Sequence, residues 1–365
     1  MLLTKSNITL PSTPCLVVNA EKMEINLREM AEFAERANVR LRPHIKTHKC
    51  PELALKQISY GAVGICVQKV SEAEVMVKNG VKNVLISNEI IGIEKVRRLV
   101  NLSKEAEMSV CVDSMEGIRQ LSQVATESDA KINCLIDIDC GYHRCGVSPT
   151  QAAKLAQQIT QMKCLELKGI TGYEGHVGSH PRKQWPKLVK LAMAVVMKAK
   201  KKIEENSISV EQVVVGGTPS AKISGLYPGV TEITPGEYIF YCYRNVKSGL
   251  VQVDRCALSV LSTAMSKPTA NRIVIDAGLK TFAFDGNGEY PYLMNENLRK
   301  AHFVSLSEEH GTLRLPSESN VKIGDILEFV PYNIGTCVNL HDTLYLTTNG
   351  RVEKTIPILA RGMTV

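Results

Sequence analysis

Residues 108–139 read MSVCVDSMEGIRQLSQVATESDAKINCLIDID, and this stretch contains the pattern that decides the fold. Two continuous apolar runs, at 108–113 and 132–139, flank the segment Met115–Val124, in which apolar residues recur at helical spacing. Continuous apolar strands that alternate with amphipathic helices are typical of a parallel sheet covered by helices on both faces. The stretch therefore predicts an α/β fold.

The same alternation extends from residue 13 to about residue 241. Further apolar runs occupy 15–18, 39–45, 62–67, 83–87, 167–173, 210–217 and 232–241. Further helical spacing is found at Met23–Ala37, Ser71–Asn79, Ile93–Leu102, Pro149–Met162 and Trp185–Ile203. Nine runs are one more than a (β/α)8 barrel requires. The competing fold is a doubly wound open sheet, but no G-x-G-x-x-G opens the first crossover. We therefore predict a (β/α)8 TIM barrel.

After about residue 245 the pattern changes to short strands joined by Gly, Asn and Pro turns. The expected strands lie at 257–265, 271–278, 302–307, 325–331 and within 342–359. The sequence TTNG at 347–350 predicts a tight hairpin, because Asn-Gly adopts the turn that joins two antiparallel strands. We predict a barrel domain at 13–245 and a mainly β domain at 246–365, with residues 1–12 as a candidate addition to the β domain.

The composition excludes several classes of protein. The 365 residues are 44% hydrophobic and 22% charged, as in globular proteins. Lys and Arg number 44 against 37 Asp and Glu, a net charge of +7. The basic residues are scattered, and the densest run, 198–202, is followed at once by Glu204 and Glu205, as on a solvated helix face. We therefore expect no nucleic-acid partner.

The apolar runs and the cysteines bear on location. No stretch approaches the ~20 apolar residues that span a bilayer, and the N-terminus lacks the apolar core of a signal peptide. The 11 cysteines are an odd number without zinc-finger spacing, and most lie inside apolar runs. We expect a cytoplasmic protein with free, buried thiols and no membrane partner.

Two polar motifs follow predicted strands, where barrel enzymes place their active sites. In RPHIKTHK (42–49), Lys46 follows an apolar residue at a strand end, and such a lysine can form a Schiff base. The alternative is a solvated loop lysine. In DIDCGYHRCGV (137–147), Arg144 is suited to hold an anionic oxygen or a ring atom. Its alternative role is a salt bridge to Asp137 or Asp139.

Three later strand ends add polar groups and glycines. GYEGHVGSH (172–180) supplies acid/base candidates, and VVVGGTPSA (213–221) allows backbone N–H groups to approach a phosphate, although it could also be an ordinary Gly-Gly turn. The candidates here are Tyr173, His176, His180, Gly216, Gly217 and Thr218, with Gly236 and Tyr238 in the ninth run. A strand-end lysine, an arginine and a Gly-Thr turn together suggest pyridoxal 5′-phosphate (PLP).

In this order, RPHIKTHK, DIDCGYHRCGV, GYEGH and VVVGGTPS resemble the D-threonine aldolase and D-serine dehydratase family. This family belongs to the alanine racemase-like, fold type III class of PLP enzymes. The resemblance extends over nearly the whole chain and implies a PLP-binding barrel followed by a D-serine dehydratase-like β domain. In this class the first run leads into the barrel, which would reconcile nine runs with eight strands. Members are typically homodimers.

The resemblance also implies roles for single residues. Lys46 would carry PLP as a Schiff base, and His180 would be a second catalytic group, a candidate base. Arg144 and Tyr173 would contact the cofactor ring. The implied phosphate contacts are Gly216, Gly217, Thr218, Gly236 and Tyr238.

One segment departs from the family pattern. Relatives hold a divalent metal by His-x-Cys or His-x-Asp shortly before N-L-x-D, and this chain reads PYNIGTCVNLHD at 331–342. Asn333 and Gly335 occupy the ligand positions, and neither is a good metal ligand. Cys337 and His341 are near in sequence, but successive residues of a strand alternate faces, so neither is an obvious substitute. A metal is therefore doubtful.

These observations predict a PLP-dependent lyase that acts on a D-configured or β-hydroxy amino acid. Metal-independent amino-acid racemisation is the first alternative, because PLP acidifies the α-proton without a metal. A non-catalytic PLP-binding protein is the second. A barrel enzyme without PLP remains only if the motif match is accidental.

Overall fold

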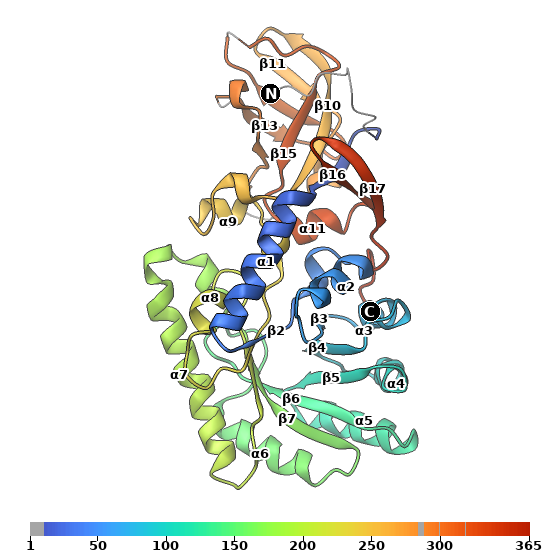
Figure 1. The fold of residues 1–365 in the computed structure, drawn as a ribbon, viewed down its shortest axis with the longest axis vertical. Helices are drawn as coiled ribbons and strands as arrows, with labels where there is room; N and C mark the ends of the chain where they lie inside the picture. Colours follow the sequence, from blue (N-terminus) through green and yellow to red (C-terminus); the bar gives the residue numbers. More distant parts are fainter. Residues whose placement is uncertain (1–10, 284–287, 299, 318) are drawn as a thin grey trace. The chain divides into compact units, whose positions relative to one another are not determined.

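The computed structural model describes residues 11–283, 288–298, 300–317 and 319–365 (Figure 1). The chain forms two compact units. The β unit comprises the chain up to Leu27, Thr47–Cys50 and Glu237–Gly362. The barrel unit comprises Arg28–Lys46, Pro51–Gly236 and Met363–Val365. Residues 1–10, most of the candidate addition to the β domain, lie outside the described residues.

The barrel unit is built on a parallel sheet, which in the described chain has eight strands in the order β2-β9-β8-β7-β6-β5-β4-β3. They are β2 (Arg40–Leu41), β3 (Ile65–Val67), β4 (Asn83–Glu89), β5 (Glu107–Val112), β6 (Ile132–Asp137), β7 (Leu165–Gly172), β8 (Gln212–Val215) and β9 (Glu232–Ile233). The two edge strands of this order, β2 and β3, are also joined, because Val63 N–H donates to Leu41 O at 2.9 Å and Cys66 N–H donates to Pro43 O at 2.8 Å. The predicted (β/α)8 barrel is confirmed.

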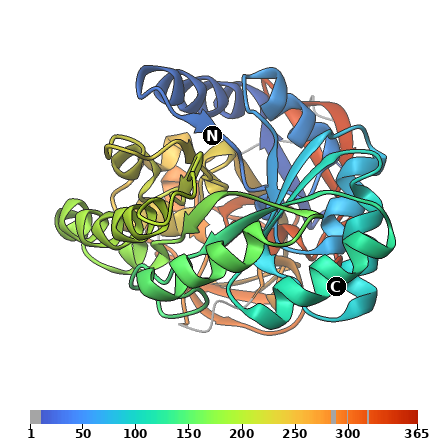
Figure 2. The same cartoon turned by 90° about the horizontal axis from the view of Figure 1, so that it is seen from below.

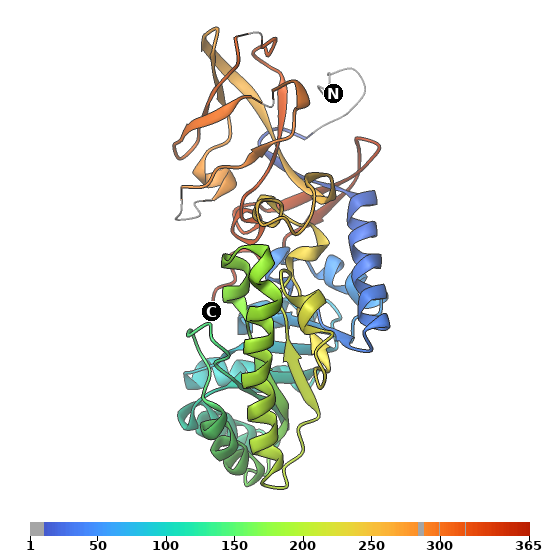
Figure 3. The ribbon, with the colours of Figure 1, turned by 90° about the vertical axis from the view of Figure 1, so that its left-hand side faces the viewer.

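Helices cover the outside of these strands, as the view from below shows (Figure 2). They are α2 (Pro51–Ser59), α3 (Val70–Lys78), α4 (Ile93–Leu102), α5 (Met115–Glu127), α6 (Pro149–Thr160), α7 (Trp185–Glu204) and α8 (Ala221–Ser224). The long α7, light green in Figure 3, packs against α6, β7 and α8. Helical spacing predicted α3 to α7, but it missed α2, where the polar Gln57 is among the buried residues.

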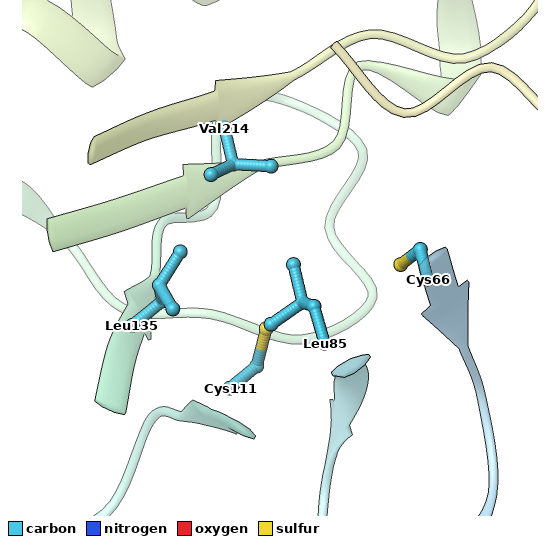
Figure 4. Close-up of a cluster of buried hydrophobic side chains, with 5 residues drawn as sticks. All are labelled: Cys66, Leu85, Cys111, Leu135 and Val214. Carbon is cyan, nitrogen blue, oxygen red and sulfur yellow. The ribbon is translucent and has the colours of Figure 1, made fainter. Parts of the chain in front are cut away.

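The barrel interior is filled by side chains. One layer consists of Cys66, Leu85, Cys111, Leu135 and Val214, which come from five different strands (Figure 4). Each is at most 2% exposed. Inward-pointing residues of alternating strand positions form such layers, so the barrel is a packed core and its chemistry is confined to the rim.

Two predicted strands are much shorter than the apolar runs suggested. The run 39–45 forms only β2 and then a 3-10 turn, Ile45–Thr47. The run 232–241 forms only β9, followed by a 3-10 turn, Glu237–Ile239. Proline explains both breaks, because Pro43 and Pro235 have no N–H group to donate to a neighbouring strand.

Within its described residues, the β unit has a nine-stranded sheet. Its strands are β1 (Cys15–Asn19), β10 (Leu258–Thr269), β11 (Arg272–Ile275), β12 (Tyr292–Leu293), β13 (His302–Leu306), β14 (Gly311–Arg314), β15 (Ile326–Val330), β16 (Thr343–Thr348) and β17 (Arg351–Pro357). β1 pairs antiparallel with β10 and parallel with β16. The first apolar run is therefore not a barrel strand, and the count of nine runs against eight strands is resolved. The helix α1 (Ala20–Arg36) follows β1.

The β16–β17 hairpin confirms the turn predicted from TTNG. Asn349 has φ 50° and Gly350 has φ 75°, the left-handed pair that this type of tight turn requires. The unit also contains short helices that no helical spacing indicated, among them α9 (Tyr243–Lys247), α10 (Leu279–Phe282) and α11 (Ile334–Val338). No helix among the described residues is long and apolar enough to cross a membrane.

All 11 cysteines lie in the described residues, and all are free thiols, as expected. Nine are buried, and Cys145 and Cys164 are half-buried.

Candidate active site

The side chains singled out in the sequence come from the carboxyl ends of barrel strands. Lys46 lies in the 3-10 turn after β2, and Arg144 lies in the loop after β6. Tyr173 directly follows β7, and Gly216 directly follows β8. Because the strands are parallel, these ends meet at one rim of the barrel.

The ring of Tyr173 lies at the centre of this group. Lys46 Nζ lies 5.8 Å from its centroid, and the guanidinium carbon of Arg144 lies 5.2 Å from it. The same guanidinium lies 5.2 Å from the ring of Tyr142. Gly217 approaches Tyr173 so closely that a Cβ on Gly217 would be 3.1 Å from Cε2 of the ring. Four predicted site residues are thus brought together.

The loop that carries Arg144 is shaped by Asp139. The Asp139 carboxylate accepts hydrogen bonds from the backbone N–H groups of Gly141 and His143, both at 3.0 Å, and pairs with His143 Nδ1 at 2.8 Å. Burial alone would raise the pKa of Asp139, but these hydrogen bonds outweigh burial and lower it. His143 adopts a left-handed backbone with φ 56°. Asp139 therefore organises the loop around His143.

A second group of carboxyls lies at the ends of β4, β5 and β6. The pKa of Asp137 is raised to about 8, chiefly by burial. Repulsion by Glu89, a hydrogen bond to Glu89 and repulsion by Asp113 raise it further, while the positive charge of Arg144 lowers it. The raised pKa favours the protonated Asp137 carboxyl, which can donate a hydrogen bond to Glu89. Asp113 instead accepts the N–H of Gly146 at 3.2 Å.

Residues 216–220 form a tight turn after β8, here called the phosphate turn. Gly216 has φ +84°, where a side chain would be strained, and a Cβ there would lie 3.2 Å from Ala221 Cα. Gly217 N–H donates to Ser220 Oγ at 3.1 Å. Thr218 is buried, and its Oγ1 has no hydrogen-bond partner among the described residues. A buried hydroxyl without a partner costs about 1–3 kcal/mol, so this atom suits a ligand oxygen.

One buried carboxylate, that of Glu174, holds this turn in place. Glu174 is 1% exposed, and its Oε2 accepts Gly216 N–H at 3.2 Å. Its Oε1 accepts the hydroxyl of Ser224, in α8. Nothing in the spacing of the sequence pointed to Glu174, Ser220 or Ser224. The only signal was the position of Glu174 inside the motif GYEGH.

The two histidines after β7 differ in environment. His180 Nδ1 lies 2.9 Å from the carbonyl oxygen of His176. Since a carbonyl only accepts, Nδ1 carries the proton, and Nε2 of the neutral ring is left with a lone pair. Burial lowers the pKa of His176, whose Nδ1 has no partner among the described residues. The His176 ring stacks on Tyr142 with centroids 6.4 Å apart.

The remaining predicted residues, Gly236 and Tyr238, follow β9 along the chain. Gly236 ends the second segment of the barrel unit, and the carbonyl of Pro235 beside it accepts the N–H of His44 at 3.1 Å. Tyr238 belongs to the β unit, where it is 1% exposed.

The segment at the family's metal positions also belongs to the β unit, and it is not a strand. Asn333 precedes the helix α11, and Gly335 lies inside it. The argument from alternating strand faces was therefore wrong: Cys337 Sγ and His341 Nε2 both contact the carbonyl oxygen of Thr281, at 3.2 and 3.0 Å. In the described part of the chain, no three His, Cys, Asp or Glu side chains are grouped to hold a metal.

The chain matches two family models. Residues 18–244 match "Alanine racemase, N-terminal domain", and residues 257–347 match "Putative serine dehydratase domain". The D-threonine aldolase of Arthrobacter sp. is 35% identical over 358 residues, which cover 96% of this chain and 93% of that protein. The 3-hydroxy-D-aspartate aldolase of Paracoccus denitrificans (strain Pd 1222) is 33% identical, with 96% and 92% covered.

A solved structure agrees with these relatives. The D-threonine aldolase from Filomicrobium marinum superposes with a TM-score of 0.92 at 33% identity, covering 97% of each chain. The resemblance read from the motifs is thereby confirmed for family and fold. The chain belongs to the family of PLP-dependent enzymes with an alanine-racemase-like barrel that includes the D-threonine aldolases and D-serine dehydratases.

Proposed function

We propose that this chain is a PLP-dependent lyase that cleaves or dehydrates a D-configured β-hydroxy amino acid. The observation that carries the proposal is the arrangement at the rim, where Lys46 and Arg144 both lie over the ring of Tyr173. Tyr173 in turn packs against Gly217, beside the buried hydroxyl of Thr218, which has no partner in the described part of the chain. An amine, a guanidinium, an aromatic ring and a phosphate turn are the groups that PLP requires.

In this proposal Lys46 is the amine that joins the aldehyde of PLP. Arg144 and Tyr173 contact the ring, and the phosphate lies in the phosphate turn. The proposed phosphate contacts are Gly216, Gly217, Thr218, Gly236 and Tyr238. When bound, PLP withdraws electrons from the α-carbon of the attached amino acid.

Two side chains then move protons. The amine of Lys46 would hold or move the proton at the α-carbon. For cleavage, His180 Nε2 would accept the proton of the β-hydroxyl, because its Nδ1 donates to the carbonyl of His176. For dehydration, the ring would instead give a proton to the hydroxyl that leaves as water. The fixed charge of Arg144 lies against both Tyr142 and Tyr173, whose rings meet edge to face at 5.5 Å and form one wall of the site.

The substrate class is supported by the relatives. Two relatives, at 35% and 33% identity, are named D-threonine aldolase and 3-hydroxy-D-aspartate aldolase, and a relative from Dictyostelium discoideum at 26% identity is named D-serine dehydratase. All three names describe D-configured amino acids, and the substrates they name carry a β-hydroxyl.

A metal-independent racemase is the second candidate. Asn333 and Gly335 favour it, because neither offers the imidazole, thiolate or carboxylate that binds a divalent metal well. Lys46 and His180 would then exchange the α-proton on the two sides of the substrate. A non-catalytic PLP-binding protein would bind the cofactor but convert neither D- nor L-amino acids.

The remaining proposals concern the whole chain. We propose a cytoplasmic homodimer. The free thiols support the cytoplasm, since disulfides are rare there. The division into domains at residue 245 is supported by the family matches, which end at 244 and resume at 257.

Lys46→Ala tests the proposed function. The purified protein, loaded with PLP, should show the visible absorbance of the cofactor and should release an aldehyde or a keto acid from D-threonine or D-serine. The variant should lose the specific absorbance and at least about 10³-fold of the activity, because no other amine can replace the nucleophile. Retention of both by the folded variant would overturn the assignment of Lys46.

A further inference from the structure

We propose that Glu174 is a positioning residue: its buried carboxylate fixes the phosphate turn relative to Tyr173 and so gives the site its preference for a phosphorylated cofactor. This inference rests on the proposed function and extends it to a residue that touches neither substrate nor cofactor.

The contacts of Glu174 link three elements of the barrel unit. The residue follows the end of β7, accepts the N–H of Gly216 after β8 at 3.2 Å, and accepts the hydroxyl of Ser224 in α8. Glu174 is 1% exposed and Ser224 is fully buried. A hydrogen bond in such a dry environment is strong and is costly to break.

The neighbour of Glu174 is the aromatic ring at the centre of the site. The Tyr173 ring lies between two glycines: a Cβ on Gly175 would be 2.3 Å from Cε1, and a Cβ on Gly217 would be 3.1 Å from Cε2. The ring therefore rests against the phosphate turn on one side. Glu174, the residue after Tyr173, holds the same turn through the N–H of Gly216. Two contacts, one with the ring and one with the carboxylate, therefore fix the position of the turn relative to Tyr173.

The hydrogen bonds within the turn explain why an outside support is needed. Ser220 N–H and Ala221 N–H donate to Gly217 O at 3.0 and 2.8 Å, which closes the turn upon itself. Gly216 precedes that closed turn and adopts φ +84°, a conformation that glycine does not favour over its alternatives. Thr234 Oγ1 donates to the carbonyl oxygen of Gly216 at 2.9 Å, and Glu174 accepts the N–H of Gly216. Glu174 thereby helps to favour this conformation before any phosphate arrives, and such preorganisation increases affinity.

The choice of variants follows from hydrogen-bond chemistry. Glutamine keeps a carbonyl oxygen for Gly216 N–H, and its NH2 group can donate to Ser224 once that hydroxyl rotates. Glu174→Gln should therefore preserve the position of the turn, whereas Glu174→Ala leaves Gly216 N–H without an acceptor. Ser224→Ala removes one support and little volume.

The experiment compares the dissociation constants of PLP and of pyridoxal, which lacks the phosphate. In Glu174→Ala the preference for PLP should fall by about tenfold or more, as expected for one lost hydrogen bond to a charged group. In Glu174→Gln it should stay within about twofold of the wild type, and in Ser224→Ala it should fall about threefold. The 31P resonance of bound PLP should shift in Glu174→Ala and return in Glu174→Gln.

A matched control is Glu72→Ala. Glu72 is another 1% exposed carboxylate of the barrel unit, and it accepts the N–H groups of Gln68 and Lys69 at 2.7 and 3.2 Å. Its loss should lower stability but leave the preference for PLP over pyridoxal unchanged. An equal loss of affinity for both ligands in Glu174→Ala would mean a merely structural role and would overturn the inference.

The outcomes separate the two proposals. If the wild type fails to bind PLP, the proposed function is wrong. If the wild type prefers PLP but the preference survives in Glu174→Ala, only the role of Glu174 is wrong. Should Glu174→Ala not fold, an unchanged preference in Ser224→Ala overturns the inference on its own.

Discussion

The barrel rim and the segment 331–342 of the β unit differ in how far each keeps the residues of its family. At the rim Lys46, Arg144 and Tyr173 are all present, and the first two lie over the ring of Tyr173. In the other segment Asn333 and Gly335 occupy the positions at which the family resemblance predicts metal ligands, and the adjacent Cys337 and His341 contact a backbone carbonyl. The difference leads us to propose that, within one fold, the metal site can be lost while the cofactor site is kept.

The most direct way to break this comparison is to remove the proposed base. His180→Ala should lower kcat for a β-hydroxy substrate by about 10²–10⁴-fold, because in the proposed reaction its imidazole moves the proton of the hydroxyl. Steady-state kinetics on D-threonine would measure the loss. His176→Ala is the companion variant, and a larger loss there would transfer the role from His180 to His176.

The comparison is sharpened by testing the altered segment itself. Activity of the wild type should be unchanged by EDTA, and metal analysis of the PLP-loaded protein should find less than one divalent ion per chain. Asn333→His combined with Gly335→Cys restores the donor types that relatives use. This variant should become EDTA-sensitive, with about a tenfold rise in activity when Mn²⁺ is added, since a bound metal polarises the hydroxyl. An EDTA-sensitive wild type would contradict the proposal that the reaction needs no metal.

The smallest expected effect concerns the carboxyls beside Arg144. The folded-state pKa of Asp137 is raised to about 8, above its ordinary value of 3.8. Between these values the folded chain binds a proton that the unfolded chain releases, so stability should fall as pH rises from about 4 to about 8. Asp137→Asn should reduce that fall by about 1–2 kcal/mol, measured by urea unfolding at a series of pH values. The same pH dependence in both proteins would rule out Asp137 as its source.

Much of the fold could be predicted because it depends on local pattern. The helices α3 to α7 follow the spacing of apolar residues, and the β16–β17 hairpin follows Asn349 and Gly350. The apolar run 232–241 misled for an equally local reason, since Pro235 ends the strand after Ile233. The short helix α11 has only five residues, too few for a helical period to be visible.

The site could be predicted only in part. Lys46, Arg144 and Tyr173 stand at strand ends, which a sequence reveals. Glu174 acts through Gly216 and Ser224, 42 and 50 residues away, and hydrogen bonds over such separations leave no periodic signal. The pairing of Asp137 with Glu89 depends in the same way on the order of strands in the barrel.

The thiols inside the barrel make the chain a reporter of its own unfolding. Burial raises the pKa of Cys66 to about 11 and that of Cys134 to about 12. Of the 11 cysteines, only Cys145 and Cys164 are partly exposed. Alkylating reagents attack the thiolate, so a brief pulse at neutral pH should modify the native protein at few positions. Each local unfolding event that opens the barrel exposes further thiols to the reagent. The mass added per molecule then records how often the barrel opens, and the modified cysteines show which strands open.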